Sequence, residues 1–247
     1  EWIDEQEKLK ADGNNPFFEP RVMGEFPTIA VDSVLALADI EKAILSPNYV
    51  NAYNSTVISC DPAFQGDDEC VIQVWHNLRL RDQQVFSKRE AMETAGHIIA
   101  TYLKHKGNLI VLDEDGAGVG IGSALREQGY GDKLLSIHSA STDGVTKDYY
   151  NLRAMMWFEV AKLFRQGIVG IPDDPILKEQ LMMPRFFRHH SGKILLIKKD
   201  EIKRVFGVSP DRADCAIYGL WGRIQMEKQM RDEIPSGRLP WFSAFRR

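Results

Sequence analysis

The fold is decided by the stretch Ile58-Ser59-Cys60-Asp61-Pro62-Ala63-Phe64-Gln65-Gly66-Asp67-Asp68-Glu69. An apolar run enters this stretch and leads to Asp61, after which a Pro and a Gly follow, as is typical of a buried strand that ends in a turn. A carboxylate at that point is expensive to bury unless it is paired or binds a cation. Asp67 and Asp68 follow on the turn, and a second apolar run resumes at Cys70. The order of strand, acid, acidic turn and strand predicts half of a divalent-cation site.

Outward from this stretch, the hydrophobic pattern predicts three strands joined by short turns, at 55–61, 70–78 and 83–88. A helix at 90–105, a buried strand at 108–113, a glycine-opened helix to about 128 and a fifth strand at 133–138 come next. The remaining elements are helices at 151–166, 174–182 and 200–206, a hairpin-like pair at 185–190 and 193–198, and a long helix from 211 to about 231. A short helix over 31–45, with Asp32-Ser33 as its N-cap, precedes them all.

Three antiparallel strands followed by helix, strand, helix, strand and helix is the element order of the RNase H-like fold. This fold is an α/β architecture in which a mixed sheet, antiparallel and then parallel, carries helices on both faces. The sequence predicts it by analogy of element order.

Four acids fall at the positions where this fold would bring them together. Asp61 ends the first strand, Asp113 ends the fourth, and Asp211 and Asp214 lie in the first turn of the last helix. Carboxylates that converge without basic partners repel each other unless they share divalent cations, and Mg²⁺ or Mn²⁺ prefers such oxygen ligands. Two ions ~3.5–4 Å apart would hold the attacking water and the leaving oxygen of a phosphodiester in line.

Each acid also has a structural explanation. Asp61 is compatible with an ordinary turn residue, and the neighbours Glu114 and Asp115 compete with Asp113 for its role. Asp211 is favoured at a helix N-terminus by the dipole, and Asp214 is favoured there too or as a partner of Arg212. Asp67 and Asp68 are weaker candidates, with a solvated turn as the alternative to a supporting metal role. The joint pattern in the predicted element order favours the catalytic interpretation.

Nucleotide-binding motifs do not occur. The glycine-rich segment 115–122 does not have the Gly-x-Gly-x-x-Gly spacing, because Ile121 and Ser123 stand where glycine is required. No Gly-x-x-x-x-Gly-Lys-Ser/Thr phosphate loop occurs in the chain either. We therefore expect these glycines to let backbone approach a neighbouring strand or DNA, and we expect no ATP hydrolysis by this chain.

A basic cluster immediately precedes the proposed catalytic helix. It favours contact with the phosphate backbone of DNA over a merely solvated charged surface. His189-His190 lacks a second ligand pair at metal spacing, so it does not predict zinc. The members of the cluster are Arg185, Arg188, Lys193, Lys198, Lys199, Lys203 and Arg204.

Composition limits the class of protein. With 247 residues, 44% hydrophobic and 27% charged, the chain is typical of a soluble globular protein of one or two domains. No apolar stretch has the length of a membrane span and no signal peptide is visible, so we expect no membrane partner. The three widely spaced cysteines, Cys60, Cys70 and Cys215, indicate a reducing compartment. The net charge of -4 confines any nucleic-acid surface to a local patch.

At this point the motifs carry a resemblance. The chain resembles the C-terminal nuclease domain of the large terminase subunit of tailed bacteriophages, the DNA-packaging motor protein. The ordered set of matching pieces covers most of residues 17–222. The pieces are Arg21-Val22-Met23-Gly24-Glu25-Phe26-Pro27, Asp61-Pro62-Ala63 with Gly66-Asp67-Asp68, Asp113 with Gly116-Ala117-Gly118-Val119-Gly120, Asn151-Leu152-Arg153-Ala154-Met155-Met156-Trp157 and Ser209-Pro210-Asp211-Arg212-Ala213-Asp214.

The resemblance implies an endonuclease that cuts concatemeric double-stranded viral DNA at the start and end of packaging. It implies two Mg²⁺ or Mn²⁺ ions held by acids matching Asp61, Asp113 and Asp211, with Asp214 a close second for the last position. It further implies the portal or procapsid and the small terminase subunit as partners, and the cytoplasm of the infected bacterial host as the location.

The resemblance also divides the chain. Residues 1–50 are expected to be a linker or the trailing edge of a preceding ATPase domain, 51–232 the nuclease domain, and 233–247 a C-terminal tail. Since the chain begins at Glu1 without Met, we expect it to be a fragment of a longer protein. Two alternatives stay open: another RNase H-like nuclease, of resolvase or transposase type, and a DNA or portal docking module in which cleavage is regulated or absent.

Overall fold

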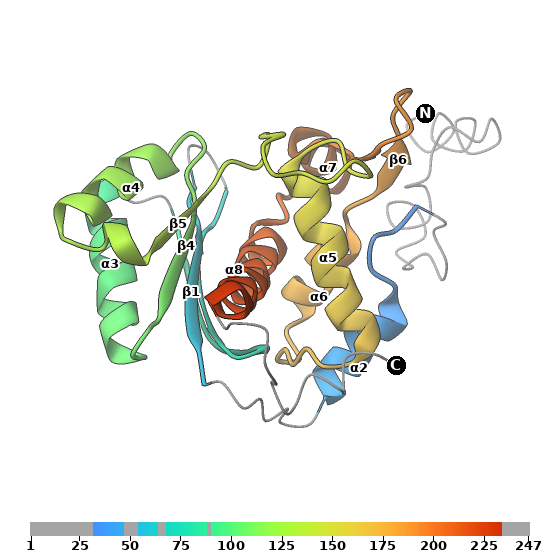
Figure 1. The fold of residues 1–247 in the computed structure, drawn as a ribbon. Coiled ribbons are helices and arrows are strands. Elements are labelled where there is room, and N and C mark those ends of the chain that lie inside the picture. Colours follow the sequence, from blue (N-terminus) through green and yellow to red (C-terminus); the bar gives the residue numbers. More distant parts are fainter. Residues whose placement is uncertain (1–31, 47–53, 64–67, 88–89, 234–247) are drawn as a thin grey trace.

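The computed structural model describes residues 32–46, 54–63, 68–87 and 90–233. Its centre is a five-stranded sheet with the strand order β3-β2-β1-β4-β5 (Figure 1). The strands are β1 (Thr56–Asp61), β2 (Cys70–His76), β3 (Arg79–Phe86), β4 (Leu109–Asp113) and β5 (Leu134–Ile137). A separate two-stranded hairpin consists of β6 (Phe186–Arg188) and β7 (Ile194–Leu196).

Strand directions follow the predicted mixed pattern. β1 pairs antiparallel with β2, and β2 pairs antiparallel with β3. On its other edge β1 pairs parallel with β4, which pairs parallel with β5. Every residue of β1 is buried, as expected for a central strand that is covered on both faces. The α/β RNase H-like sheet is thereby confirmed.

Helices cover both faces of the sheet. α3 and α4 lie on one face, α8 lies on the other, and α5 and α6 lie on the outer side of α8 (Figure 1). Their hydrophobic contacts form two cores, one on each side of the sheet. The helices are α2 (Leu37–Leu45), α3 (Ala91–Lys104), α4 (Gly118–Glu127), α5 (Leu152–Gln166), α6 (Pro175–Met182), α7 (Lys199–Phe206) and α8 (Asp211–Glu233), with a 3₁₀ turn η2 (Gly131–Lys133).

Two predicted boundaries are wrong for identifiable reasons. The first helix begins at Leu37 and has no side-chain cap; Ser33, expected to cap it, instead forms a β-bridge with Arg185. The second strand ends at His76 and the third already begins at Arg79, because Asn77 makes a tight turn between them with φ 55. Asn tolerates this left-handed conformation, and its side-chain oxygen accepts a hydrogen bond from Ser55 N at 3.1 Å.

Close packing of α8 on the sheet depends on two glycines. A Cβ at Gly219 would collide with the indole ring of Trp75, and one at Gly222 would collide with Val111. Since neither residue has a side chain, the α8 backbone approaches β1, β2 and β4 closely. This approach sets the depth at which the start of α8 meets the strand ends.

The glycine-rich segment also packs against a strand. A Cβ at Gly118 would collide with the carbonyl oxygen of Asp113, so only glycine lets α4 start directly at the end of β4. The expectation that these glycines allow close approach of backbone to a neighbouring strand is met at this position.

Cys60, Cys70 and Cys215 are all buried free thiols. None of the helices in the described ranges combines the length and the apolar character needed to cross a membrane.

Candidate active site

Two acids meet at the carboxyl ends of neighbouring parallel strands. β1 and β4 run side by side with Cys60 opposite Leu112, so the next residues, Asp61 and Asp113, emerge together. Asp61 is only 3% exposed, whereas Asp113 is half-buried. The predicted juxtaposition follows directly from the parallel register of the two strands.

The start of α8 brings two more acids to the same place. Asp211 is the first residue of the helix, and Asp214, one turn later, is 1% exposed. The sequence therefore located all four acids correctly at one end of the sheet, from three elements far apart in the chain.

A lysine lies among these acids, contrary to the expectation that they converge without a basic partner. The Lys199 Nζ is 3.0 Å from Asp61 Oδ2, 3.0 Å from Asp211 Oδ1 and 3.5 Å from Asp214 Oδ2. Lys199 was predicted to contact the DNA backbone as part of the basic cluster. That prediction is corrected, because its position at the start of α7 directs it into the acid cluster.

The chain itself already binds both oxygens of Asp211. Ser209 Oγ donates a hydrogen bond to Oδ1 at 2.6 Å, and the backbone N–H of Glu69 donates to Oδ2 at 2.9 Å. These contacts fix the carboxylate and connect the acidic turn after β1 to the start of α8.

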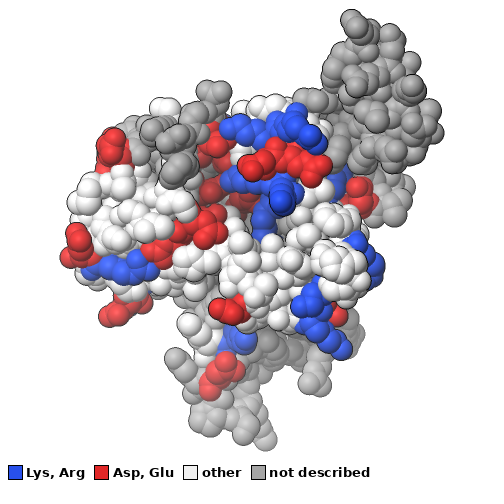
Figure 2. Space-filling model, turned by 90° about the horizontal axis from the view of Figure 1, so that it is seen from above, with Lys and Arg blue, Asp and Glu red and all other residues white. Residues whose placement is uncertain are grey.

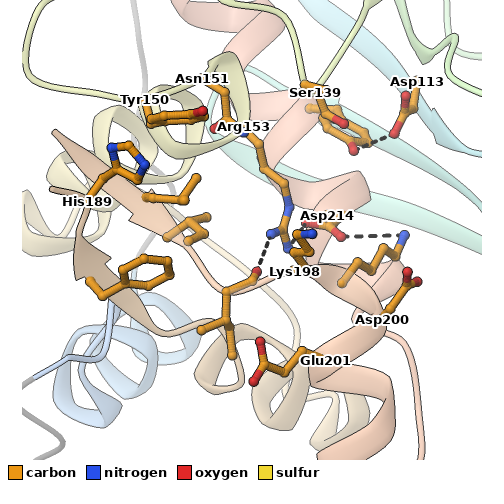
Figure 3. Close-up of a pocket in the computed structure, with 17 residues that line it drawn as sticks. Asp113, Ser139, Tyr150, Asn151, Arg153, His189, Lys198, Asp200, Glu201 and Asp214 are labelled. Atoms are coloured by element: carbon orange, nitrogen blue, oxygen red, sulfur yellow. Dashed lines mark hydrogen bonds and ion pairs between the residues drawn. The ribbon is translucent and has the colours of Figure 1, made fainter. Parts of the chain in front are cut away.

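Asp214 and Asp113 each accept a hydrogen bond from an aromatic side chain, and Asp113 Oδ1 also accepts one from the backbone N–H of Asp115 at 3.1 Å. Trp157 Nε1 donates to Asp214 Oδ1 at 3.0 Å, which leaves the buried Oδ2 without a hydrogen bond to any described residue. Tyr218 donates its phenolic proton to Asp113 Oδ2 at 2.7 Å (Figure 3). Sequence reasoning missed both donors. Tyr218 lies one helical turn after Asp214 and was therefore within reach of a helical-face argument, whereas Trp157 had no such signal.

Burial and charge shift the ionisation of the site strongly. Burial raises the pKa of Asp61 well above its usual value against the opposing effect of Lys199, and the neighbouring carboxylates raise it further. Burial also raises the pKa of Asp113, although the Tyr218 hydrogen bond works in the other direction. Burial alone would lower the pKa of Lys199, but Asp61, Asp214 and Asp211 raise it well above the usual value. The cluster is short of positive charge.

The carboxylate oxygens of the four acids are suitable ligands for a hard divalent cation, although the ammonium group of Lys199 lies between them in this structure. Within the described residues, no three His, Cys, Asp or Glu side chains are already arranged around a metal position. All candidate donors are carboxylate oxygens, and the buried Oδ2 of Asp214 lacks a hydrogen bond within the described chain. Both features match the oxygen ligands that Mg²⁺ and Mn²⁺ require. Asp61, Asp113, Asp211 and Asp214 are the residues that would hold such ions.

Only part of the predicted basic cluster forms an outward surface. Arg185 is 3% exposed and donates to Met182 O at 3.0 Å, so it holds the hairpin in place and is not a surface contact. Lys203 pairs with Asp68 at 2.7 Å, and Arg204 lies 3.7 Å from Glu201. Seen from above, Lys and Arg side chains alternate with Asp and Glu and do not form one basic face (Figure 2). Arg188, Lys193 and Lys198 remain DNA-contact candidates, as does Arg204, whose side chain is 78% exposed.

The acidic turn after β1 is only partly described. Asp67 lies outside the described residues, while Asp68 is engaged by Lys203. Arg212 pairs with Glu69 at 2.8 Å and with Asp174 at 3.4 Å. Asp214 is therefore not the partner of Arg212, which removes that structural explanation for it.

Comparisons with known proteins place the fold. No family model matches the chain, and no curated protein matches its sequence. Solved structures do match. A mutant nuclease domain of the large terminase subunit of bacterial virus Sf6, with manganese and beta-thujaplicinol, has a TM-score of 0.64 and 16% identity over 75% of this chain and 96% of that chain.

The large terminase nuclease from thermophilic phage G20c has a TM-score of 0.57 and 16% identity, over 76% of this chain and 97% of that chain. Its form with bound magnesium has a TM-score of 0.54 and 17% identity, over 76% and 98%. The structural neighbours of this chain are therefore nuclease domains of phage large terminase subunits, and the chain has their RNase H-like fold.

Proposed function

We propose that this chain is the nuclease domain of a large terminase subunit, an endonuclease that depends on divalent cations and cuts concatemeric double-stranded viral DNA during packaging. The observation that carries the proposal is the convergence of Asp61, Asp113 and the two acids of α8 on one end of the sheet. The similarity in fold to terminase nucleases, some of them with manganese or magnesium, supports it.

Two bound Mg²⁺ or Mn²⁺ ions would supply the charge that stabilises a phosphodiester as it is hydrolysed. The chain supplies a rigid holder for them. Asp61 and Asp113 project from β1 and β4, which pair by backbone hydrogen bonds, and Tyr218 and Trp157 fix the orientations of Asp113 and Asp214. Rigid placement of this kind is what a catalytic carboxylate needs.

The wider role follows from the same proposal. Residues 1–50 would connect to an ATPase domain, 51–232 would form the nuclease, and 233–247 would form a tail. The partners would be double-stranded DNA, the portal or procapsid and the small terminase subunit, in the cytoplasm of an infected bacterium.

The test is nicking of supercoiled plasmid DNA in Mn²⁺ by Asp61→Asn and Asp113→Asn. Both substitutions keep the side-chain shape, and we expect each to lower the rate by at least on the order of 100-fold, since even the partners of metal ligands contribute 10–100-fold. Asp132→Asn, an exposed acid in η2, is the matched control and should cleave like the parent. Full cleavage by the Asp61→Asn/Asp113→Asn double variant would contradict the proposal.

The position of Lys199 favours a second candidate, a module in which cleavage is restrained or absent. An ammonium group between Asp61 and Asp211 opposes the entry of a second cation. Calorimetric titration with Mn²⁺ separates the two: a nuclease binds Mn²⁺ in a manner that Asp61→Asn abolishes, whereas a docking module shows no binding that depends on the acids.

A further inference from the structure

A cavity of about 690 Å³ opens directly beside the acids. It lies between the N-terminal end of α5, the β6–β7 hairpin and the start of α7. Asp113 and Asp214 line it near the acid cluster, while Tyr150 and His189 lie together on its opposite side (Figure 3). Its volume is within the range of roughly 300–1,000 Å³ that sites for small ligands occupy.

The far side of the cavity is aromatic. Tyr150 is 39% exposed, and its ring centroid is 4.6 Å from that of His189, which in turn is 3.7 Å from that of His190. Partial removal from water and the neighbouring His190 lower the pKa of His189, so its ring is neutral near pH 7. The exposed Tyr150 ring and the partly buried His189 ring offer faces on which a flat ligand stacks.

The wall between the two sides is apolar. Phe187, 46% exposed, lines the cavity together with Leu195 and Ile197. Arg153 also lines the cavity. It donates to Ile197 O at 2.9 Å and lies 3.7 Å from Asp214, while its buried Nη2 makes no hydrogen bond to any described residue (Figure 3). An apolar wall offers a phosphate group neither a positive charge nor a hydrogen-bond donor. The groups that fit against it are the flat faces of nucleobases.

In a DNA duplex those faces are covered by the neighbouring bases. Only unpaired nucleotides present them, and single strands bind proteins by stacking on aromatic side chains while the backbone follows positive charge. Lys198, exposed on the rim of the cavity, supplies such a charge for the backbone.

We propose that this cavity binds the bases of an unpaired stretch of the strand being cut, next to the scissile phosphate, with Tyr150 and His189 as the stacking platform. The inference rests on the proposed nuclease function and adds that the duplex opens beside the cut. Bare duplex DNA would then use the acid end of the site without using the aromatic end.

The experiment measures binding of fluorescein-labelled oligo(dT), and of a duplex of the same length, to the 247-residue chain in Ca²⁺. We expect Tyr150→Ala and His189→Ala each to weaken single-strand binding roughly 5- to 100-fold, the effect of losing one stacking side chain. Tyr150→Phe should restore it, because it keeps the ring. His97→Ala is the matched control, since His97 also contacts an aromatic ring, Phe86 at 4.8 Å, but on α3 away from the cavity.

The outcomes distinguish the proposed single-strand binding from the proposed nuclease function. Loss of single-strand binding with duplex binding retained supports the inference. Unchanged single-strand binding in both variants overturns it, as does an equal loss for single strands and duplex, and neither result affects the cleavage test of Asp61→Asn. If Tyr150→Ala does not fold, as judged by thermal melting, His189→Ala on the exposed hairpin decides alone. Failure of the parent chain to bind any DNA or to cleave plasmid counts against both proposals.

Discussion

Asp113 and Glu114 are adjacent in the chain but lie in opposite electrostatic settings. Glu114 is matched by one cation, since Arg126 Nη2 donates to Glu114 Oε2 at 2.8 Å and to Ser136 Oγ at 3.0 Å. Asp113 faces the other way, into a group of four carboxylates that contains the single ammonium of Lys199. The negative charge of Glu114 is balanced by Arg126, whereas Asp113 belongs to a cluster with excess negative charge.

The difference distinguishes structural acids from functional ones. Arg126 lowers the pKa of Glu114, so this carboxylate stays ionised and gains stability from its partner. Burial raises the pKa of Asp61 and Asp113, so ionising them costs free energy in the folded chain unless positive charge is added. A site that lacks positive charge is a site for cations, and the following predictions test that contrast.

The largest expected effect separates the two acids of α8. Asp211 accepts hydrogen bonds from Ser209 and Glu69 on both oxygens, while Asp214 Oδ2 accepts none from the described residues. We therefore expect Asp214→Asn to lower Mn²⁺-dependent cleavage on the order of 100-fold and Asp211→Asn roughly tenfold. Single-turnover cleavage of a labelled duplex measures both. A larger loss for Asp211→Asn would reverse the assignment and favour Asp211 as the principal ligand.

Removing the ammonium group of Lys199 tests whether the acid cluster is a cation site. Lys199→Ala removes the ammonium group from three carboxylates. We expect the free energy of unfolding of the metal-free protein to fall by about 1–2 kcal/mol, less than for a fully buried pair because the Lys199 side chain is 36% exposed. Mn²⁺ should then bind more tightly and restore the lost stability. Thermal melting with and without Mn²⁺ measures both effects.

Lys198→Ala is the control for that experiment, since Lys198 is the neighbouring residue and exposed. It should leave both the metal-free stability and the response to Mn²⁺ unchanged. If Lys199→Ala binds Mn²⁺ no better than the parent chain, the lysine does not compete with cations.

The sheet and the acids were predictable because local pattern determines them. Apolar runs bounded by turn residues indicated the strands, and apolar residues at helical spacing indicated helices such as α3. Asp61 and Asp113 end strands whose parallel pairing follows from the element order. The helix predicted at 151–166 also ends at Gln166, and Gly167 follows it with φ 68.

The partners of the acids were not predictable, because they come from distant elements. Lys199 reaches Asp61 across 138 residues and Trp157 reaches Asp214 across 57. A lysine in a run of basic residues gives no sign of whether it points outward or inward, and Arg185 in the same run is buried. The direction depends on where α7 and the hairpin pack, which is a property of tertiary structure.

The smallest expected effect concerns the ion pair of Glu114 with Arg126. Because Arg126 lowers the pKa of Glu114 below its usual 4.5, the stability from this carboxylate is present above the unfolded-state pKa and is lost as pH falls through the folded-state pKa. Glu114→Gln should therefore cost about 1 kcal/mol at pH 7, a modest value because half of the Arg126 side chain is exposed, and the difference from the parent should close as pH falls below about 4.5.

Urea unfolding at a series of pH values measures this difference. Mn²⁺ binding should be unchanged in Glu114→Gln, because the carboxylate faces Arg126 on α4 and not the acid cluster. Weaker Mn²⁺ binding in this variant would mean that Glu114 and Asp113 belong to the same cation site. The distinction between a structural and a functional carboxylate at the end of β4 would then be wrong.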